Sequence, residues 1–283
     1  MQILDGRKVA SLILSELTNE VVLLNKKNVQ PKLVIISVGE NPASALYIRA
    51  KQHACKKIGI LSDLLKFPEN LTTEALISTI QSLNTDSSVH GIIVQLPLPK
   101  TISTPLVIRA ILPKKDVDGF HAYNLGKMFL STEFEDLAPS TPSGIVRLLE
   151  HYEITFEGKE VTVVGHSNIV GKPISVMLLN RNATVTICHI YTKDLAKHTR
   201  NAEILIVAVG KPGLITADMV RSGVIAVDVG INRLPDGSVC GDIDFLNVSK
   251  KATFITPVPG GVGPMTVACL LENVVKSAKR LNI

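Results

Sequence analysis

Short aliphatic runs alternate with stretches of mixed polarity along most of the chain. Continuous runs of Val, Ile and Leu are typical of strands buried on both faces, and the stretches between them have the length of helices. Asn41 and Pro42 suit the start of one helix, because Asn caps a helix N-terminus and Pro is tolerated at its first position. In the first half the pattern predicts strands at 33–38, 62–67 and 91–95, and helices at 42–59 and from 72 or 73 to 83.

A second set of alternating elements follows in the other half of the chain. Because strand, helix and strand alternate, right-handed crossovers would give a parallel sheet. The segment from Asp116 to about Pro142 has mixed polarity and turn residues, so we place the domain junction there. The second set comprises predicted strands at 161–164, 184–187, 204–209 and 225–229, and predicted helices at 173–182, near 193–201, near 216–222 and at about 264–281.

Composition narrows the class of protein. The chain has 283 residues, of which 46% are hydrophobic, 4% are aromatic and none is Trp. This length fits one large or two modest domains, and this hydrophobic content excludes global disorder. An aliphatic core of this kind suits parallel strands covered by helices. We therefore predict an α/β protein.

Charge and apolar runs limit the possible partners. The 30 basic and 25 acidic residues give a net charge of +5, which is modest and not concentrated in blocks. This excess fits an ordinary solvated surface. Among functional interpretations a specific anionic ligand is the better one, because nucleic acid would need a denser basic stripe. No apolar run approaches the roughly 18 residues of a membrane helix, and the N-terminus lacks a signal-type apolar core. We expect a cytoplasmic protein that binds neither nucleic acid nor membrane.

The cysteines are scattered and form no Cys-x-x-Cys pair. Zinc-binding and redox-active pairs depend on such spacing, so we expect reduced, buried thiols and no metal site.

One glycine-containing turn has the features of a phosphate site. Gly165 ends a predicted strand, and Gly171 precedes a predicted helix whose N-terminus would offer N–H groups and a positive dipole to a pyrophosphate. Gly171 lies six positions after Gly165, rather than the five of the common G-x-G-x-x-G motif, and Ser167 stands where the second glycine of that motif would. A plain strand-to-helix turn stays an alternative.

The end of the next strand bears on the type of nucleotide. NAD-binding proteins usually carry an Asp or Glu there for the ribose 2′-hydroxyl. Residues 187–193 contain no acid, whereas His189 and Lys193 lie there and His166 and Lys172 lie in the preceding turn. This composition permits NADP, although each basic residue alone could belong to the surface.

Candidate chemistry lies in the first half. Tyr47 and Lys51 share one helix face at a spacing of i and i+4, where an amine beside a phenol could transfer protons or form a solvated surface pair. Gln95 ends a buried strand, where ligands of parallel sheets collect, but it could also be a satisfied structural amide.

Two loops offer further ligand contacts. Asp116 and Asp118 lack the Gly and Glu that a calcium loop needs further on, so we reject calcium. They suit hydrogen bonds to a ligand with amide and amino groups, or simple turn formation. The segment 256–266 is dense in Gly and Pro, so it could present bare backbone N–H groups to a ligand or serve as a rigid connector.

These motifs together resemble one known family. The chain is similar to the bifunctional methylenetetrahydrofolate dehydrogenase/methenyltetrahydrofolate cyclohydrolases essentially over its whole length, with the motifs in family order. The resemblance rests on Tyr47-x-x-x-Lys51, the run from Val94 to Pro99, the run from Lys115 to Phe120, the turn Gly165-x-Ser167-x-x-Val170-Gly171-x-Pro173, and the run from Thr256 to Thr266.

The resemblance implies two α/β domains, the C-terminal one a Rossmann-type doubly wound parallel sheet, with a substrate cleft between them. It implies a folate-binding catalytic domain of residues 1–120 completed by a C-terminal helix at about 264–283, and an NADP-binding domain of residues 140–258. The family oxidises 5,10-methylenetetrahydrofolate to the 5,10-methenyl form with NADP. It then hydrolyses that form to 10-formyltetrahydrofolate, serving one-carbon metabolism. The resemblance also implies a homodimer.

Site residues can be carried over position by position. The resemblance implies that Lys51 transfers protons during hydrolysis, that Tyr47 packs by the folate, that Gln95 bonds Lys51, and that Asp118 anchors the pterin ring. Other positions matching folate-site or nearby residues of the family are Ser44, Pro259, Gly260, Gly263 and Thr266. Positions matching NADP contacts are Gly165, His166, Ser167, Ile190 and Ile231.

The chain departs from the family at two cofactor positions. Many members have Arg where His166 stands and Ser or Arg where Ile190 stands, and both usually hold the 2′-phosphate. A neutral His supplies less charge than Arg at pH 7, so NAD use stays open. The competing hypotheses are another two-domain NADP-dependent dehydrogenase and a non-catalytic dinucleotide sensor.

Overall fold

The computed structural model describes residues 1–281 and divides the chain into two compact units. Unit 1 contains Met1–Ser11, Met128–Thr132 and Thr141–Thr266. Unit 2 contains Leu12–Lys127, Glu133–Ser140 and the residues from Val267 on. Each unit is α/β, as the hydrophobic pattern predicts.

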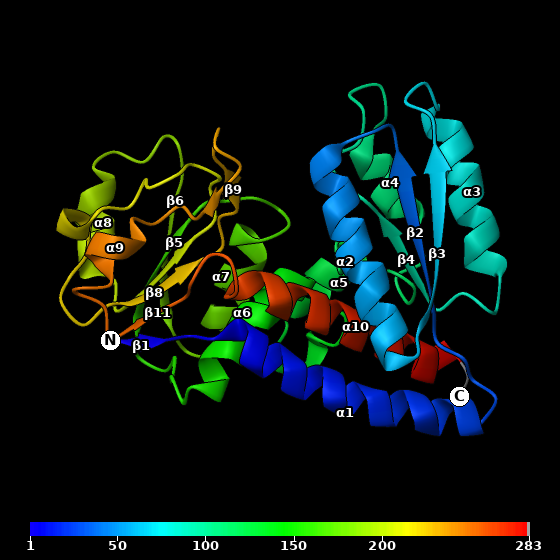
Figure 1. The fold of residues 1–283 in the computed structure, drawn as a ribbon, viewed down its shortest axis with the longest axis horizontal. Coiled ribbons are helices and arrows are strands. Elements are labelled where there is room, and N and C mark those ends of the chain that lie inside the picture. The colour runs from blue at the N-terminus through cyan, green and yellow to red at the C-terminus, as the bar shows by residue number, and fades with distance from the viewer. Residues whose placement is uncertain (282–283) are drawn as a thin grey trace. The chain divides into compact units, whose positions relative to one another are not determined.

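Unit 2 is built on a parallel sheet of order β3-β2-β4, formed by Leu61–Phe67, Lys32–Val38 and Gly91–Val94. Val34, Ile36 and Val38 form a core with the helices α3 (Thr73–Thr85) and α4 (Thr104–Ala110) on one face. The helix α2 (Pro42–Ile58) lies on the opposite side of the sheet from α3 (Figure 1). The sheet is therefore covered on both faces, which explains its continuous aliphatic strands.

Two long helices contribute to both units along their length. The helix α1 spans Gly6–Lys26 and the helix α10 spans Val262–Leu281. Within unit 2, α10 is tied to the loops around β4, because Asn273 Nδ2 donates to Val117 O and Ser277 Oγ donates to Lys114 O. Residues 282 and 283 of the predicted C-terminal helix lie outside the described residues.

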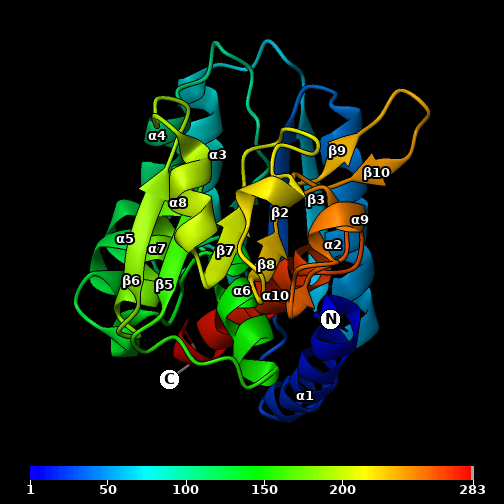
Figure 2. The ribbon, with the colours of Figure 1, turned by 90° about the vertical axis from the view of Figure 1, so that its left-hand side faces the viewer.

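Unit 1 contains a six-stranded parallel sheet of order β1-β11-β8-β7-β5-β6. The chain runs from β5 outward to β6 and then crosses back to β7 and β8, so the order reverses beside β5. This is the doubly wound arrangement, which collects ligands where the order reverses. Figure 2 shows β6, β5, β7 and β8 side by side. The strands are Gln2–Ile3, Glu160–Val164, Thr184–Cys188, Ile204–Val207, Ile225–Asp228 and Phe254–Ile255, numbered β1, β5, β6, β7, β8 and β11.

Helices cover this sheet, and a small hairpin projects from it. Leu195 of α8 (Leu195–Asn201) and Val248 of α9 (Phe245–Val248) pack with one core cluster of the sheet. The remaining elements are α5 (Ala122–Met128), η1 (Thr132–Phe134), α6 (Ser140–His151), α7 (Gly171–Leu179), η2 (Ala217–Met219), and the antiparallel pair β9 (Asn232–Arg233) and β10 (Val239–Cys240).

The structure contains several elements that the pattern did not predict, among them β1, β11, α4, α5, α6 and α9. The helix α1 was not predicted, although Val9, Ile13 and Leu17 give it a buried face at helical spacing. Only the single 3-10 turn η2 occupies the predicted helix near 216–222. Residues 1–11 group with unit 1, and β1 pairs with β11.

Candidate functional site

Lys51 and Gln95 meet at the C-terminal end of the sheet in unit 2. Lys51 lies on α2, and Gln95 directly follows β4. Lys51 Nζ donates a hydrogen bond of 3.2 Å to Gln95 Oε1, while Gln95 Nε2 donates to Leu96 O at 2.8 Å. The Gln95 amide is therefore oriented by the backbone, with its oxygen toward the lysine.

Asp118 and Asp116 differ in their hydrogen bonds. Burial holds the pKa of the Asp118 carboxyl above its ordinary value, and the positive charge of Lys51 offsets part of that rise. No residue in the described part of the chain donates a hydrogen bond to the Asp118 side chain, so its oxygens are available to a ligand.

Asp116 is a structural residue rather than a ligand contact. Its carboxylate accepts from the backbone N–H of His121 at 2.8 Å and from Asn124 Nδ2 at 2.9 Å. Burial raises the pKa of this carboxyl, and these donors offset part of the rise. The expectation that both carboxylates serve a ligand is thus too broad, because Asp116 fixes its own loop.

Ser44 and Tyr47 lie on α2 ahead of Lys51. Ser44 is buried, its N–H donates to the capping Asn41 Oδ1, and its hydroxyl lies 3.5 Å from Leu96 O. Tyr47 is one helical turn before Lys51, and 42% of its side chain is exposed. An amine, an amide, a carboxylate and a phenol therefore belong to one surface of unit 2.

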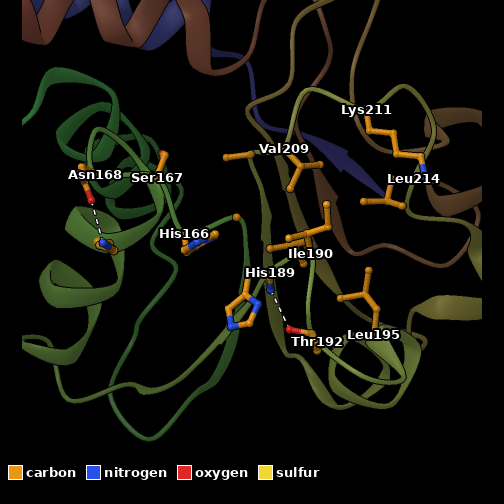
Figure 3. Close-up of a pocket in the computed structure, with 14 residues that line it drawn as sticks. His166, Ser167, Asn168, His189, Ile190, Thr192, Leu195, Val209, Lys211 and Leu214 are labelled. Carbon is orange, nitrogen blue, oxygen red and sulfur yellow. Dashed lines mark hydrogen bonds between the residues drawn. The ribbon is translucent and has the colours of Figure 1, made fainter. Parts of the chain in front are cut away.

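Unit 1 contains a cavity of about 720 Å³ at the C-terminal ends of β5, β6 and β7. Gly165, His166, Ser167 and Ile190, four of the five predicted cofactor residues, line it. Figure 3 shows His166, Ser167 and Asn168 on one side of the cavity and Lys211 and Leu214 on the other. Ile231 is exposed and does not line this cavity, but its side chain lies close to Gly263.

The two glycines of the turn are required by close backbone contacts. Gly165 has φ +120°, and a Cβ there would lie 2.3 Å from Ala208 O. A Cβ at Gly171 would lie 2.0 Å from Gly165 O. The turn between strand and helix therefore tolerates no side chain at either position, and its backbone is exposed to a ligand over Ser167 and Asn168.

Ser167 occupies part of the predicted phosphate cradle. Its Oγ accepts from the N–H groups of Val170 at 3.1 Å and Gly171 at 3.4 Å, at the start of α7. The expectation that bare helix N–H groups face a pyrophosphate is therefore modified in this chain. The exposed Ser167 hydroxyl can donate its own proton to an anion in their place.

The cavity lining is cationic. It includes Lys172, Lys211, His166 and His189, and it contains no Asp or Glu. The rings of His166 and His189 lie 5.0 Å apart between centroids. Because no carboxylate stands at the end of β6, the cavity suits a ligand with a phosphate beside its ribose.

The Gly- and Pro-rich segment belongs to unit 1. Gly260 has φ +117° and accepts at its carbonyl from Arg7 N–H at 3.2 Å. Thr266 Oγ1 lies 3.0 Å from Thr141 Oγ1, and Pro259 is exposed. The predicted substrate residues thus form two groups: Ser44, Tyr47, Lys51, Gln95 and Asp118 in unit 2, and Pro259, Gly260, Gly263 and Thr266 in unit 1.

Sequence reasoning missed the wall of the cavity that follows β7. Val209 and Lys211 line it, and the buried Asp242 accepts from the N–H groups of the residues 209–211. The rule that ligands collect at the ends of parallel strands could have identified Val209 and Lys211. No local pattern marks Asp242.

Residues 1–281 contain neither a membrane-spanning helix nor a cluster of metal-binding side chains. None of the helices within residues 1–281 is long and apolar enough to cross a membrane. No group of three or more His, Cys, Asp and Glu side chains in that part of the chain could hold a metal ion.

Comparison with known proteins agrees with the motifs. Residues 4–118 match the model of the tetrahydrofolate dehydrogenase/cyclohydrolase catalytic domain, and residues 139–282 match the NAD(P)-binding domain of the same family. The chain is 55% identical over 279 residues to the bifunctional protein FolD of Nautilia profundicola, covering 99% of this chain and 98% of the relative.

Solved structures are similar over nearly the full length. The bifunctional FolD methylenetetrahydrofolate dehydrogenase/cyclohydrolase of Campylobacter jejuni is 50% identical with a TM-score of 0.95, covering 99% of both chains. The Trypanosoma brucei FolD complexed with NADP cofactor and inhibitor is 36% identical with a TM-score of 0.94, covering 98% of this chain and 97% of that one. Both domains of the family match in their expected order along the chain, and a relative is 55% identical over nearly the full length. The chain therefore belongs to the tetrahydrofolate dehydrogenase/cyclohydrolase family.

Proposed function

We propose that this protein oxidises 5,10-methylenetetrahydrofolate to 5,10-methenyltetrahydrofolate with NADP and hydrolyses the product to 10-formyltetrahydrofolate. The observation that carries the proposal is the Lys51–Gln95 hydrogen bond at the end of β4, with the open carboxylate of Asp118 within reach of the lysine's charge. A family of dehydrogenases and cyclohydrolases needs one group that moves protons during hydrolysis. Lys51 is the candidate for that role.

The cavity in unit 1 fits NADP on its own chemistry. Gly165 and Gly171 keep side chains out of the turn, as a closely approaching pyrophosphate requires. Two lysines and two histidines in a lining without carboxylates favour a ligand with an added phosphate. In this proposal Gly165, Ser167 and Lys172 hold the phosphates, while His166, His189 and Ile190 surround the ribose 2′-phosphate. When bound, NADP supplies the acceptor of the two electrons and the hydrogen that the substrate loses.

In this proposal Lys51 is the residue that transfers protons during hydrolysis, because its hydrogen bond to Gln95 fixes the position of its amine. Gln95 Oε1 accepts one N–H of the Lys51 ammonium, and an ammonium has three. In its neutral form, the Lys51 amine can accept the proton that water loses as its oxygen bonds to the methenyl carbon. The resulting ammonium can return a proton to the ring nitrogen as its bond to that carbon breaks, and the new hydroxyl loses its proton to solvent as it becomes the formyl oxygen. Gln95 acts as a positioning residue because its amide is itself anchored on Leu96 O.

Asp118 is proposed to hold the pterin ring. The ring carries adjacent amino and amide N–H groups, and a carboxylate accepts two such donors side by side. Tyr47 provides apolar surface beside it, and Ser44 holds the start of α2 near Leu96. Pro259, Gly260, Gly263 and Thr266 in unit 1 stay proposed folate-site residues, and Ile231 a proposed NADP contact.

We also propose two domains. The folate-binding domain comprises residues 1–120 and 264–283, and the NADP-binding domain comprises residues 140–258. A homodimer, which the family resemblance implies, and a cytoplasmic location, which we expect from the pattern of apolar residues, are also proposals. Sedimentation of the purified protein and fractionation of the source cells would test them.

A coupled assay tests the activity. The protein is mixed with 5,10-methylenetetrahydrofolate and NADP, and in parallel with NAD, while NADPH or NADH formation and the decay of the methenyl absorbance are followed. We expect NADPH formation followed by decay of the methenyl form. If the protein does not oxidise 5,10-methylenetetrahydrofolate but does oxidise another small molecule with NADP, it is another dehydrogenase. If it binds the nucleotide without any turnover, it is a sensor.

A further inference from the structure

A buried carboxylate in unit 1 holds the cavity wall that follows β7. Asp242 is completely buried, and its Oδ2 accepts from the N–H groups of Val209 at 2.7 Å and Gly210 at 3.0 Å. Its Oδ1 accepts from Lys211 N–H at 2.9 Å and from Asn232 Nδ2 at 2.8 Å. Three consecutive backbone donors thus converge on one side chain, and a carboxylate is the group that can accept all of them.

The held segment is part of the cofactor cavity. Val209 and Lys211 line that cavity, and Figure 3 shows Lys211 across from His166 and Ser167. The same segment packs on the phosphate-binding turn, since a Cβ at Gly165 would meet Ala208 O at 2.3 Å and Val209 Cγ1 at 3.5 Å. A shift of residues 208–211 would therefore move the turn as well.

A second carboxylate fixes Asp242. Asp228 Oδ1 accepts from Asp242 N–H at 2.9 Å, and Asp228 Oδ2 accepts from Ile243 N–H at 2.8 Å. Two glycines leave the space for this pair: a Cβ at Gly230 would lie 2.3 Å from Asp242 Cγ, and one at Gly241 would lie 1.9 Å from Asp228 Oδ2. Any residue other than glycine at these two positions would therefore displace one of the two carboxylates.

We infer that Asp242 is a positioning residue for NADP, acting through the backbone of residues 209–211 without touching the cofactor. The inference rests on the proposed assignment of the cavity to NADP. Replacing the carboxylate by an amide leaves one acceptor oxygen for four donors and turns an NH₂ group toward N–H groups. The cavity wall should then loosen, and cofactor binding should weaken while the chemistry assigned to unit 2 persists.

The test compares Asp242→Asn with wild type and with the control Asp236→Asn, whose carboxylate lies in an exposed turn. Three quantities are measured: the dissociation constant of NADPH from its fluorescence, the KM for NADP in the dehydrogenase assay, and the rate of methenyltetrahydrofolate hydrolysis without nucleotide. We expect Asp242→Asn to raise the first two about tenfold or more, a change of about 1.4 kcal/mol. We expect the hydrolysis rate to change less than twofold.

Two results would overturn the inference. One is a folded Asp242→Asn protein with wild-type affinity for NADPH, and the other is an equal loss of hydrolysis and dehydrogenation, which indicates a structural role only. If Asp242→Asn does not fold, Asn232→Ala removes a single donor from Asp242 and should raise the NADPH dissociation constant about two- to fivefold, with an unchanged constant overturning the inference. Wild-type protein that binds no NADPH would refute the proposed function itself.

Discussion

Each unit contains a pair of aspartates close to its proposed site, and the two pairs differ in their donors. In unit 1, Asp228 and Asp242 accept three and four N–H groups, so protein donors occupy most or all of their acceptor sites. In unit 2, Asp116 is satisfied in the same way, whereas Asp118 accepts nothing from residues 1–281.

The difference shows that the role of a buried acid follows from its donors rather than from burial alone. A carboxylate that organises backbone has its acceptor sites filled, because an unfilled site in a dry environment is costly. A carboxylate that binds a ligand keeps unfilled acceptor sites in the free protein, and the donors of the ligand offset their unfavourable free energy on binding. By this criterion we assign Asp118 to the proposed binding surface and the other three aspartates to the framework.

The largest expected effect is the loss of hydrolysis when Lys51, the lysine near Asp118, is replaced. Lys51→Met should reduce methenyltetrahydrofolate hydrolysis by about 10²- to 10⁴-fold, the usual contribution of a proton-transferring group. Dehydrogenation should persist, because loss of hydride leaves a cation stabilised by two nitrogens and needs no base. Lys57→Met, at an exposed lysine of the same helix, is the control. Equal loss of both activities in a folded Lys51 variant would contradict the assignment.

The two aspartates of unit 2 should respond in opposite ways. Asp118→Asn should raise the KM for the folate substrate about tenfold and leave the thermal midpoint nearly unchanged, because only ligand contacts are lost. Asp116→Asn should lower the free energy of unfolding by about 1–3 kcal/mol, since it leaves backbone donors of its loop unpaired. The KM and the thermal midpoint of both variants give the comparison, and a thermal effect confined to Asp118 would reverse our interpretation.

The saturated pair of unit 1 should contribute a pH dependence of stability. Burial raises the pKa of Asp228 from 3.8 to about 6, and its three N–H donors and the neighbouring Asp242 modify that rise. Between these values the folded state binds the extra proton, so its stabilisation is complete below about pH 4 and is lost as pH rises through about 6. From pH 5 to pH 7.5 the loss should be about 1 kcal/mol.

Denaturant titrations of wild type and Asp228→Asn at those two pH values measure this contribution. The difference in unfolding free energy between the two proteins should change with pH in the stated direction. A constant difference would show that Asp228 keeps the same protonation in the folded and unfolded chains.

The smallest effect concerns the exposed charges of the cavity. His166→Arg should lower the KM for NADP about two- to fivefold and leave the KM for NAD unchanged, because a permanent cation would face the 2′-phosphate. Steady-state kinetics with both nucleotides are sufficient. A KM for NADP that stays the same or rises would remove His166 from the 2′-phosphate site.

The sequence predicts the elements whose signals are local. The strands β2 to β8 and the cap of α2 by Asn41 follow from aliphatic runs and capping chemistry, and the structure confirms them. The two-residue strands β1 and β11 were not predicted, because so short a segment gives no periodic pattern. The helix α1 was also predictable, since Val9, Ile13, Leu17 and Val21 repeat at helical spacing. The pattern was weakened by the missing acidic residue in its first turn, where Asp5 supplies the cap from outside.

The remaining features depend on contacts between distant residues. The carboxylate of Asp116 is hydrogen-bonded only because the chain brings the backbone of His121 and the side chain of Asn124 back to it. Asp118 lies two residues further on without such donors among the described residues, and the sequence does not reveal this difference. Asp242 meets residues 209–211 only once β7 and β8 are aligned. For the same reason Ser167 could be recognised as a turn residue, but not as the acceptor of the N–H groups of Val170 and Gly171.

The pairing of β1 with β11 has a consequence for how this protein is made and dissected. Gln2 is translated well before its partner Phe254, so the six-stranded sheet can be completed only after all the residues between them have been synthesised. A fragment starting at residue 128 would expose the backbone of β11 as a bare edge, which invites another chain to pair there. Recombinant fragments of the nucleotide-binding half should therefore aggregate unless the first residues are supplied in trans or grafted back.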